Sequence, residues 1–333
     1  MRDRALIKLT LIGALCALLL STTAMAQLTA QQQAARDKGL VLYQQSDWYD
    51  SQPLLQVAAA AGDRTAQYYL AEAIRLSSSY TTVEARKWYE AAAEQGDLYA
   101  MLRLSSSSDL CHQMGTCTGK AGPEWRKAAL KLAHERAERG DTEAMTVLYI
   151  ANQGLGWLEK AADGGDSYAQ KVLAGRYQDG AGWFFIPGNR QKAVKKWFKA
   201  SAEGGYPLGM FFYADYLYEN NGSKEEIGYW LKKAAEGGHI DSLSTYALHV
   251  AGMPNEFGYP IDLIKGYGLT YLISKFEGGG AGGGAGVADF GKESLVKIAA
   301  KMTPDEIKQG VAFAKEWEKT HPPLSYFVPV YGY

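Results

Sequence analysis

A helix-turn-helix pattern recurs along most of this chain and leaves few folds open to it. In each copy an alanine-rich run ends in a glycine and a second helical run begins at once, with the turn glycine at positions 62, 96, 140, 165, 205 and 238. The successive spacings are 34, 44, 25, 40 and 33 residues, which is the range of helical repeat proteins. The pattern therefore predicts helix pairs that stack side by side in sequence order.

The copies also agree at fixed offsets from the turn glycine. Alanine stands three residues before it in every copy, a small residue stands four after it, and Leu or Tyr stands eight after it. These offsets fall on one face of each helix, so we expect them to form the seam between helices, with the residue eight before the glycine filling the gap to the next repeat. The residues at that last position are Leu54, Trp88, Leu132, Trp157, Trp197 and Trp230.

The turns themselves have a chemical explanation. Glycine can end the first helix because it accepts the left-handed backbone conformation that other residues resist. An aspartate directly after the glycine predicts an N-cap for the second helix in four copies, at Asp63, Asp97, Asp141 and Asp166.

Two of the copies, "ARKWYEAAAEQGDLYAMLRL" and "AVKKWFKASAEGGYPLGMFFYADYLYENN", resemble Sel-1-like repeats, which are relatives of the tetratricopeptide repeat. The resemblance covers roughly residues 47–320. It implies an all-α fold, a right-handed α-solenoid of about seven helix-pair repeats with capping helices at both ends. Residues 27–46 are predicted to be the N-terminal capping helix.

The C-terminal part continues this organisation. "IDLIKGYGLTYLISKFEGGG" resembles a further repeat helix, and Thr303, Pro304 and Glu306 predict the start of a closing helix with a capping box. The glycine-rich stretch 278–286 is interpreted as a flexible linker. The tail, residues 321–333, is rich in proline and aromatic residues and cannot be helical throughout. Two interpretations of it stay open: it covers the end of the solenoid, or it docks on another chain.

The first 26 residues are predicted to be a secretory signal peptide. Arg2, Arg4 and Lys8 precede an uncharged apolar run, and Ala24-Met25-Ala26 forms a cleavage site. Of the chain's 35 basic and 36 acidic residues, three and one lie in this segment, so the mature chain has a formal charge of −3. That charge does not favour nucleic acid as a partner. We expect the periplasm of a Gram-negative bacterium as the location and no membrane-spanning segment in the mature chain.

Two departures from the repeat are candidates for function. An insertion carries Cys111 and Cys117, the two cysteines that remain after processing, and an oxidising compartment favours a disulfide between them over a redox pair or a metal site with His112. A loop inserts four large apolar residues in a row, Trp183, Phe184, Phe185 and Ile186, which either pack on the next repeat or contact a partner. The predicted partner-binding residues are Trp183, Phe184, Phe185, Phe211, Tyr213 and Tyr246.

The sequence predicts no catalytic site. Ser294 and Lys297 match the S-x-x-K motif of β-lactam-binding enzymes, but the companion S-D-N and K-T-G motifs are missing. The five histidines are scattered, and no spacing indicates a metal site or a bound cofactor. Acidic residues that recur two positions before the turn are expected to be structural, because a catalytic group is needed only once.

The function expected from these features is protein binding without catalysis. Exported Sel-1-like repeat proteins include immunity proteins that occupy phospholipase-type toxins of the type VI secretion system. The resemblance therefore implies a periplasmic immunity protein whose partner is a lipase or phospholipase toxin, neutralised sterically. One alternative is a periplasmic regulator or assembly scaffold for envelope signalling or polysaccharide export. A third is a secreted repeat protein that hydrolyses β-lactams.

Overall fold

Sixteen α-helices follow one another along residues 27–106, 119–278 and 280–332, the part of the chain that the structure, a computed structural model, describes. An isolated β-bridge joins His239 and Ser325. The helices are α2 (Ala30–Gln44), α3 (Trp48–Ala60), α4 (Arg64–Ser78), α5 (Val83–Glu94), α6 (Leu98–Leu104), α8 (Gly122–Ala137), α9 (Thr142–Ile150), α10 (Leu155–Asp163), α11 (Ser167–Gln178), α12 (Asn189–Glu203), α13 (Pro207–Glu219), α14 (Lys224–Glu236), α15 (Ile240–Val250), α16 (Leu263–Ser274), α17 (Gly280–Ala299) and α18 (Pro304–Thr320).

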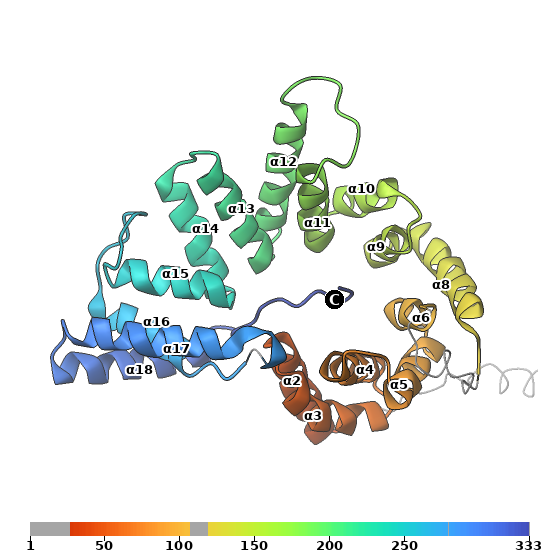
Figure 1. The fold of residues 1–333 in the computed structure, drawn as a ribbon, viewed down its shortest axis with the longest axis horizontal. Helices are drawn as coiled ribbons and strands as arrows, with labels where there is room; N and C mark the ends of the chain where they lie inside the picture. Colours follow the sequence, from red (N-terminus) through yellow and green to blue (C-terminus); the bar gives the residue numbers. More distant parts are fainter. Residues whose placement is uncertain (1–26, 107–118, 279, 333) are drawn as a thin grey trace, which may run out of the picture.

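The helices stack in sequence order, as the repeat pattern predicts. From α2 to α16 each helix packs mainly on its neighbours in sequence, and α16 then packs on both α17 and α18. Figure 1 shows that the array curves until one end of α17 comes close to α2, with the C-terminal segment running toward the centre. The fold is an all-helical solenoid bent into a nearly closed ring. No described helix has the length and apolar character needed to cross a lipid bilayer.

The six turn glycines have the predicted backbone conformation. Their φ angles lie between +83° and +93°, in the left-handed region that glycine adopts without a steric penalty. The four predicted N-caps are also confirmed, since the carboxylates of Asp63, Asp97, Asp141 and Asp166 each accept from a backbone N–H of the following helix at 2.7–3.0 Å. Local chemistry therefore fixes where most of the hairpins turn.

The seam between helices is partly different from the prediction. The alanines three before each glycine and the residues four and eight after it are buried, as expected. The residue eight before the glycine is only half-buried in five of the six copies, Trp197 being the exception. The next residue along is the one in the core, as Tyr89, Leu158 and Phe198 illustrate. The Trp or Leu thus lies at the edge of the seam.

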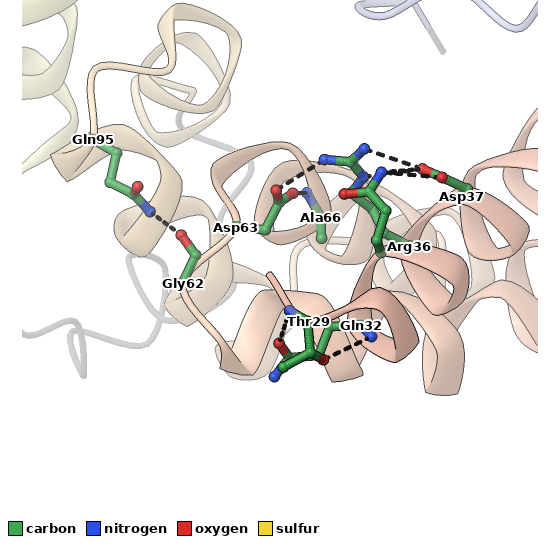
Figure 2. Close-up of polar contacts among 9 residues, drawn as sticks. Thr29, Gln32, Arg36, Asp37, Gly62, Asp63, Ala66 and Gln95 are labelled. Atoms are coloured by element: carbon green, nitrogen blue, oxygen red, sulfur yellow. Dashed lines mark hydrogen bonds and ion pairs between the residues drawn. The ribbon is translucent and has the colours of Figure 1, made fainter. Parts of the chain in front are cut away.

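Polar contacts connect the N-terminal helix to the first hairpin (Figure 2). The Thr29 side chain and backbone form a capping box at the start of α2. Arg36 reaches from α2 to Asp63 at 3.2 Å, and the same carboxylate caps α4. From the next repeat, the Gln95 side chain donates to the Gly62 carbonyl at 3.1 Å. Adjacent repeats are therefore joined at their turns as well as through their apolar faces.

The C-terminal helices close the array. Thr303 and Glu306 form the predicted capping box at the start of α18. The prediction of a flexible linker over residues 278–286 is wrong from Gly280 onward, because α17 begins there. Further along α17, Gly291 has no side chain and so allows the backbone of α16 at Ser274 to approach closely. Phe276, at a position where a repeat would have alanine, is buried and packs against Tyr326 of the tail.

Two predictions lie outside the described residues. The signal peptide occupies residues 1–26, and the disulfide between Cys111 and Cys117 falls within residues 107–118.

Candidate protein-binding surfaces

The C-terminal segment lies on the inner face of the ring. We call residues 322–332 the strap; it contains no helix and runs toward the centre of the array (Figure 1). At the sixth hairpin the Ser325 amide donates to the Gly238 carbonyl at 2.8 Å, and the Ser325 carbonyl accepts from the Ile240 amide at 3.2 Å. The strap is therefore bound through its backbone, as a strand is bound in a sheet.

The first helix holds the strap from the other side. The Tyr326 amide donates to the Gln44 carbonyl at 3.0 Å, and the Gln44 side-chain amide donates to the Val328 carbonyl at 3.3 Å. The Gln45 side chain donates to the Leu324 carbonyl at 3.0 Å. These bonds and those at Gly238 connect the N-terminal helix to the sixth hairpin, although the two lie far apart in sequence.

Tyr68 of α4 binds the strap farther along. Its hydroxyl donates to the Val330 carbonyl at 2.5 Å, and its side chain is buried. Burial raises the pKa of Tyr68 well above its ordinary value, so the phenol stays neutral and able to donate. Every one of these hydrogen bonds recognises main-chain groups, which means that the inner face can hold an extended segment without reading its side chains.

Aromatic side chains of the strap occupy separate places on the inner face. Phe327 packs edge-on against Tyr206, with ring centroids 5.9 Å apart, and lies 6.1 Å from the His239 ring. Tyr331 stacks on Tyr99 of α6 at 6.3 Å. Val328 is buried beside the first two repeats. The inner face thus combines backbone recognition with apolar places for alternate side chains, the usual arrangement of a peptide-binding groove.

A buried ionic network supports one of those places. Glu72 is 1% exposed and pairs with Arg103 at 2.6 Å and with Arg75 at 2.8 Å, while the Tyr89 hydroxyl donates to it at 2.5 Å. The ion pair with Glu72 fixes the Arg103 guanidinium, which lies 4.1 Å from the centroid of the Tyr331 ring. A fixed, charge-paired guanidinium is a rigid platform for an aromatic ring.

A second surface is the loop between α11 and α12. We call residues 182–188 the aromatic loop. Its base is rigid, since the Arg190 guanidinium donates to the carbonyls of Tyr177, Ala181 and Gly182. Phe184 turns inward and packs edge-on against Tyr177 with ring centroids 5.0 Å apart. One of the inserted aromatic residues therefore anchors the loop.

The other apolar side chains of the aromatic loop are open to solvent. Trp183 and Phe185 are each 89% exposed, and Ile186 is 63% exposed. The rings of Trp183 and Phe185 stack with centroids 6.4 Å apart. These two rings are the most exposed large apolar side chains in the described part of the chain, and they stand together.

The structure divides the six predicted partner-binding residues. It brings Trp183 and Phe185 together on the surface and places Phe184 beneath them. Tyr213 and Tyr246 are 1% and 3% exposed, so as placed they belong to the core and are covered from a partner. Their positions in the repeat explain this, because both stand eight residues after a turn glycine, where the other copies have buried leucines.

Phe211 lies apart from the aromatic loop. It is half-buried, contacts the His239 ring at 4.7 Å and lines a hollow of about 260 Å³ between α13, α14 and α15. Asp215 and His249 line the same hollow, and burial raises the pKa of Asp215. The His239 ring lies between Phe211 and Phe327 of the strap, so the hollow adjoins the inner-face groove there.

Sequence reasoning missed most of the groove residues. Gln44 and Gln45 stand outside the repeat pattern, and Gly238 and Ile240 contribute only backbone groups, so no residue type marks them. The role of Tyr68 as a donor depends on the path of the strap, which no local sequence pattern shows. The one available signal was the density of aromatic residues in the tail itself.

The described residues show no cluster of metal-ligating side chains. They contain no group of three or more histidine, cysteine, aspartate and glutamate side chains able to hold a metal ion. Ser294 is 4% exposed on α17, whereas Lys297 of the same S-x-x-K match is exposed. The side chains of Ser294 and Lys297 are therefore not exposed together on one surface.

No family model matches the sequence, and no curated protein matches it. Several solved structures do. A protective antigen of uropathogenic Escherichia coli with an SLR fold is 18% identical, with a TM-score of 0.46, over 88% of this chain and 62% of its own length. The chain thus spans about three fifths of that protein. A Sel1 repeat protein from Oxalobacter formigenes is 21% identical, with a TM-score of 0.35, over 68% of this chain and 93% of its own.

The chain is similar to Sel1-like repeat proteins. An immunity protein from Pseudomonas aeruginosa is also among the matches, at 16% identity and a TM-score of 0.37, over 85% of this chain and 88% of its own. With identities and TM-scores this low, the assignment of the Sel1-like fold rests on the helix pairs and turn glycines of the chain itself.

Proposed function

We propose that this Sel1-like protein is an immunity protein: a periplasmic solenoid that binds a toxin and neutralises it by steric exclusion. The single observation behind the proposal is that the inner face already holds an extended polypeptide segment, the strap. Gln44, Gln45, Tyr68 and the turn at Gly238 hold the strap through hydrogen bonds with its main-chain groups. A groove of this kind can accept a segment of another protein in place of the strap.

The class of toxin follows from the family resemblance and the export signal. Exported Sel-1-like proteins that resemble this one include immunity proteins against phospholipase-type toxins of the type VI secretion system. A partner that attacks the inner membrane from the periplasm would meet this protein there. Held in the groove, the toxin would be kept from lipid by the bulk of the ring, and no catalytic residue is required of the solenoid.

The test is coexpression of the full chain in the periplasm with a periplasm-directed lipase toxin from an adjacent gene. We expect growth to be restored and a one-to-one complex to be recovered. A chain that ends at His321 lacks the competing strap and is expected to bind the toxin more tightly. Tyr49→Ser is a matched control, since Tyr49 is 77% exposed on α3 and contacts no part of the groove.

Two results would contradict the proposal. Failure of the full chain to restore growth would show that this toxin is not its partner. Loss of toxin binding by the shortened chain, with its helical circular dichroism intact, would show that the strap is part of the binding surface and that the groove is not an acceptor.

A further inference from the structure

The aromatic loop lies outside the inner-face groove and needs an explanation of its own. Trp183, Phe185 and Ile186 are exposed on a loop that extends farther from the centre of the array than the helices beside it (Figure 1). Large apolar side chains gathered on a soluble surface mark either a protein interface or a membrane contact. The shape and the charge of the surroundings distinguish these two.

The shape favours a lipid surface. Hot spots of protein interfaces lie at the centre of a broader patch whose rim keeps water out. Here the apolar residues form the tip of a projection. A tip of this kind inserts readily into the boundary between headgroups and acyl chains, where tryptophan and phenylalanine are favoured.

The charge also favours a lipid surface, specifically an anionic one. From Arg176 to Lys196 the chain carries five basic residues and one acidic residue, Asp179, whereas the whole chain has a formal charge of −1. Lys192, Lys195 and Lys196 are exposed on the first turns of α12. At a rise of about 1.5 Å per residue, these lysines lie about 6 to 12 Å along the helix axis from Gly188, at the end of the aromatic loop. That distance is comparable to the Debye length of about 8 Å.

The rigidity of the base makes insertion more favourable. Arg190 holds three carbonyls of the loop, and Phe184 is packed against Tyr177. The exposed rings of Trp183 and Phe185 are already stacked. Little conformational entropy is therefore lost when the loop enters the interface.

We propose that the aromatic loop is a membrane-docking element that inserts Trp183, Phe185 and Ile186 into an anionic phospholipid surface while the lysines of α12 contact the headgroups. This inference does not depend on the toxin or on the groove. It gives the solenoid a place on the bilayer surface, with the inner face free for a protein partner.

The experiment uses the chain from Gln27 onward and sedimentation with two kinds of vesicle, phosphatidylcholine alone and phosphatidylcholine containing phosphatidylglycerol. We expect binding to the anionic vesicles that weakens as salt is raised. The double variant Trp183→Ser/Phe185→Ser is expected to lower the partition coefficient about ten-fold or more, because the inserted apolar area is lost. Lys192→Ala and Lys195→Ala should each lower it about five-fold, on anionic vesicles only.

Matched variants separate docking from general stickiness. Tyr49→Ser removes a comparably exposed aromatic residue from α3, and Lys315→Ala removes an exposed lysine from α18; both should bind vesicles like the unmodified chain. Glu219 of α13 lines the same hollow as Arg190, so Glu219→Gln should strengthen anionic binding. Trp183→Phe should reduce the blue shift of tryptophan fluorescence on vesicle addition.

The proposal is overturned by either of two results. One is absence of vesicle binding by the chain from Gln27 onward at low salt. The other is vesicle binding that the Trp183→Ser/Phe185→Ser variant leaves unchanged. If that variant instead loses capture of a protein partner while no vesicle binding exists, the aromatic loop is a protein anchor.

Discussion

His239 is a buried titratable residue where the groove, a helix start and the strap meet. It is 1% exposed, and its Nδ1 accepts from the Ser242 amide at the start of α15. Its ring lies between Phe211 and Phe327. Burial lowers the pKa of His239 to about 4, so the folded protein keeps the ring neutral. The strap is thus held beside a histidine that resists protonation.

This predicts a pH-dependent contribution to stability. Because the folded pKa is lower than the unfolded one, the unfolded chain binds the proton more readily, and stability is lost as pH falls from about 6.5 to about 4. The full effect is on the order of 3 kcal/mol. His239→Asn keeps a capping side chain but cannot titrate, so its free energy of unfolding should lack this loss in denaturant titrations across that pH range.

The comparison has to be made between variants. Asp97 titrates in the opposite sense, since burial raises its pKa to about 6 and its folded form binds the proton more readily. The difference between the unmodified chain and His239→Asn isolates the histidine. A difference that is constant from pH 7 to pH 4 would contradict the buried, neutral ring.

Two turn glycines provide a matched pair at the residue scale. Gly205 has φ +85° and open space where a Cβ would lie, whereas a Cβ on Gly238, at φ +90°, would lie 2.7 Å from the Pro323 carbonyl oxygen of the strap. Gly205→Ala should lose about 1 kcal/mol through backbone strain alone. Gly238→Ala should lose more, because it also displaces the strap; equal losses in thermal unfolding would argue against that contact.

At the scale of the helix, the sequence predicted the turns better than the seams. Turn glycines and aspartate caps act locally, within a few residues, so a single sequence reveals them. Which face of the first helix enters the core depends on the neighbouring repeats as well. Trp88 and Tyr89 show the difference: the tryptophan marks the repeat, but the tyrosine beside it is fully buried and donates to Glu72.

Variants of α10 can measure this difference. Leu158 is fully buried, whereas Trp157 is half-buried, packs edge-on against His134 and lies under Lys160. Leu158→Ala should destabilise the protein by about 2–5 kcal/mol because it leaves a cavity. Trp157→Ala should cost less despite the larger side chain removed. Chemical denaturation of both variants tests the order, and the reverse order would place the tryptophan in the core.

At the scale of the whole molecule, repeat composition explains the solenoid but not its closure into a ring. Stacking of neighbours is encoded in every copy, and so it was predictable. Closure depends on contacts between residues almost three hundred positions apart, such as Gln44 with Val328, that follow no repeat. The tail was expected to cover the end of the solenoid or to dock on another chain. Leu324 and Tyr326 pack on the apolar cluster of the C-terminal helices, and the strap then continues along the inner face of its own chain.

The strap therefore should control how far the ring is closed. A chain that ends at His321 loses the hydrogen bonds to Gln44, Gln45 and Tyr68 at one end and to the Gly238 turn at the other. Since the helices pack on their sequence neighbours, its circular dichroism should stay helical while its radius of gyration in small-angle X-ray scattering increases.

The point variant Tyr331→Ala separates closure from local packing. It removes only the ring that lies over Arg103 and beside Tyr99, and leaves the hydrogen bonds of the strap in place. Its scattering should match that of the unmodified chain. If the scattering of the shortened chain also matches, contacts between α2 and the C-terminal helices are sufficient to close the ring. Release of the strap would then leave the curvature of the binding surface unchanged.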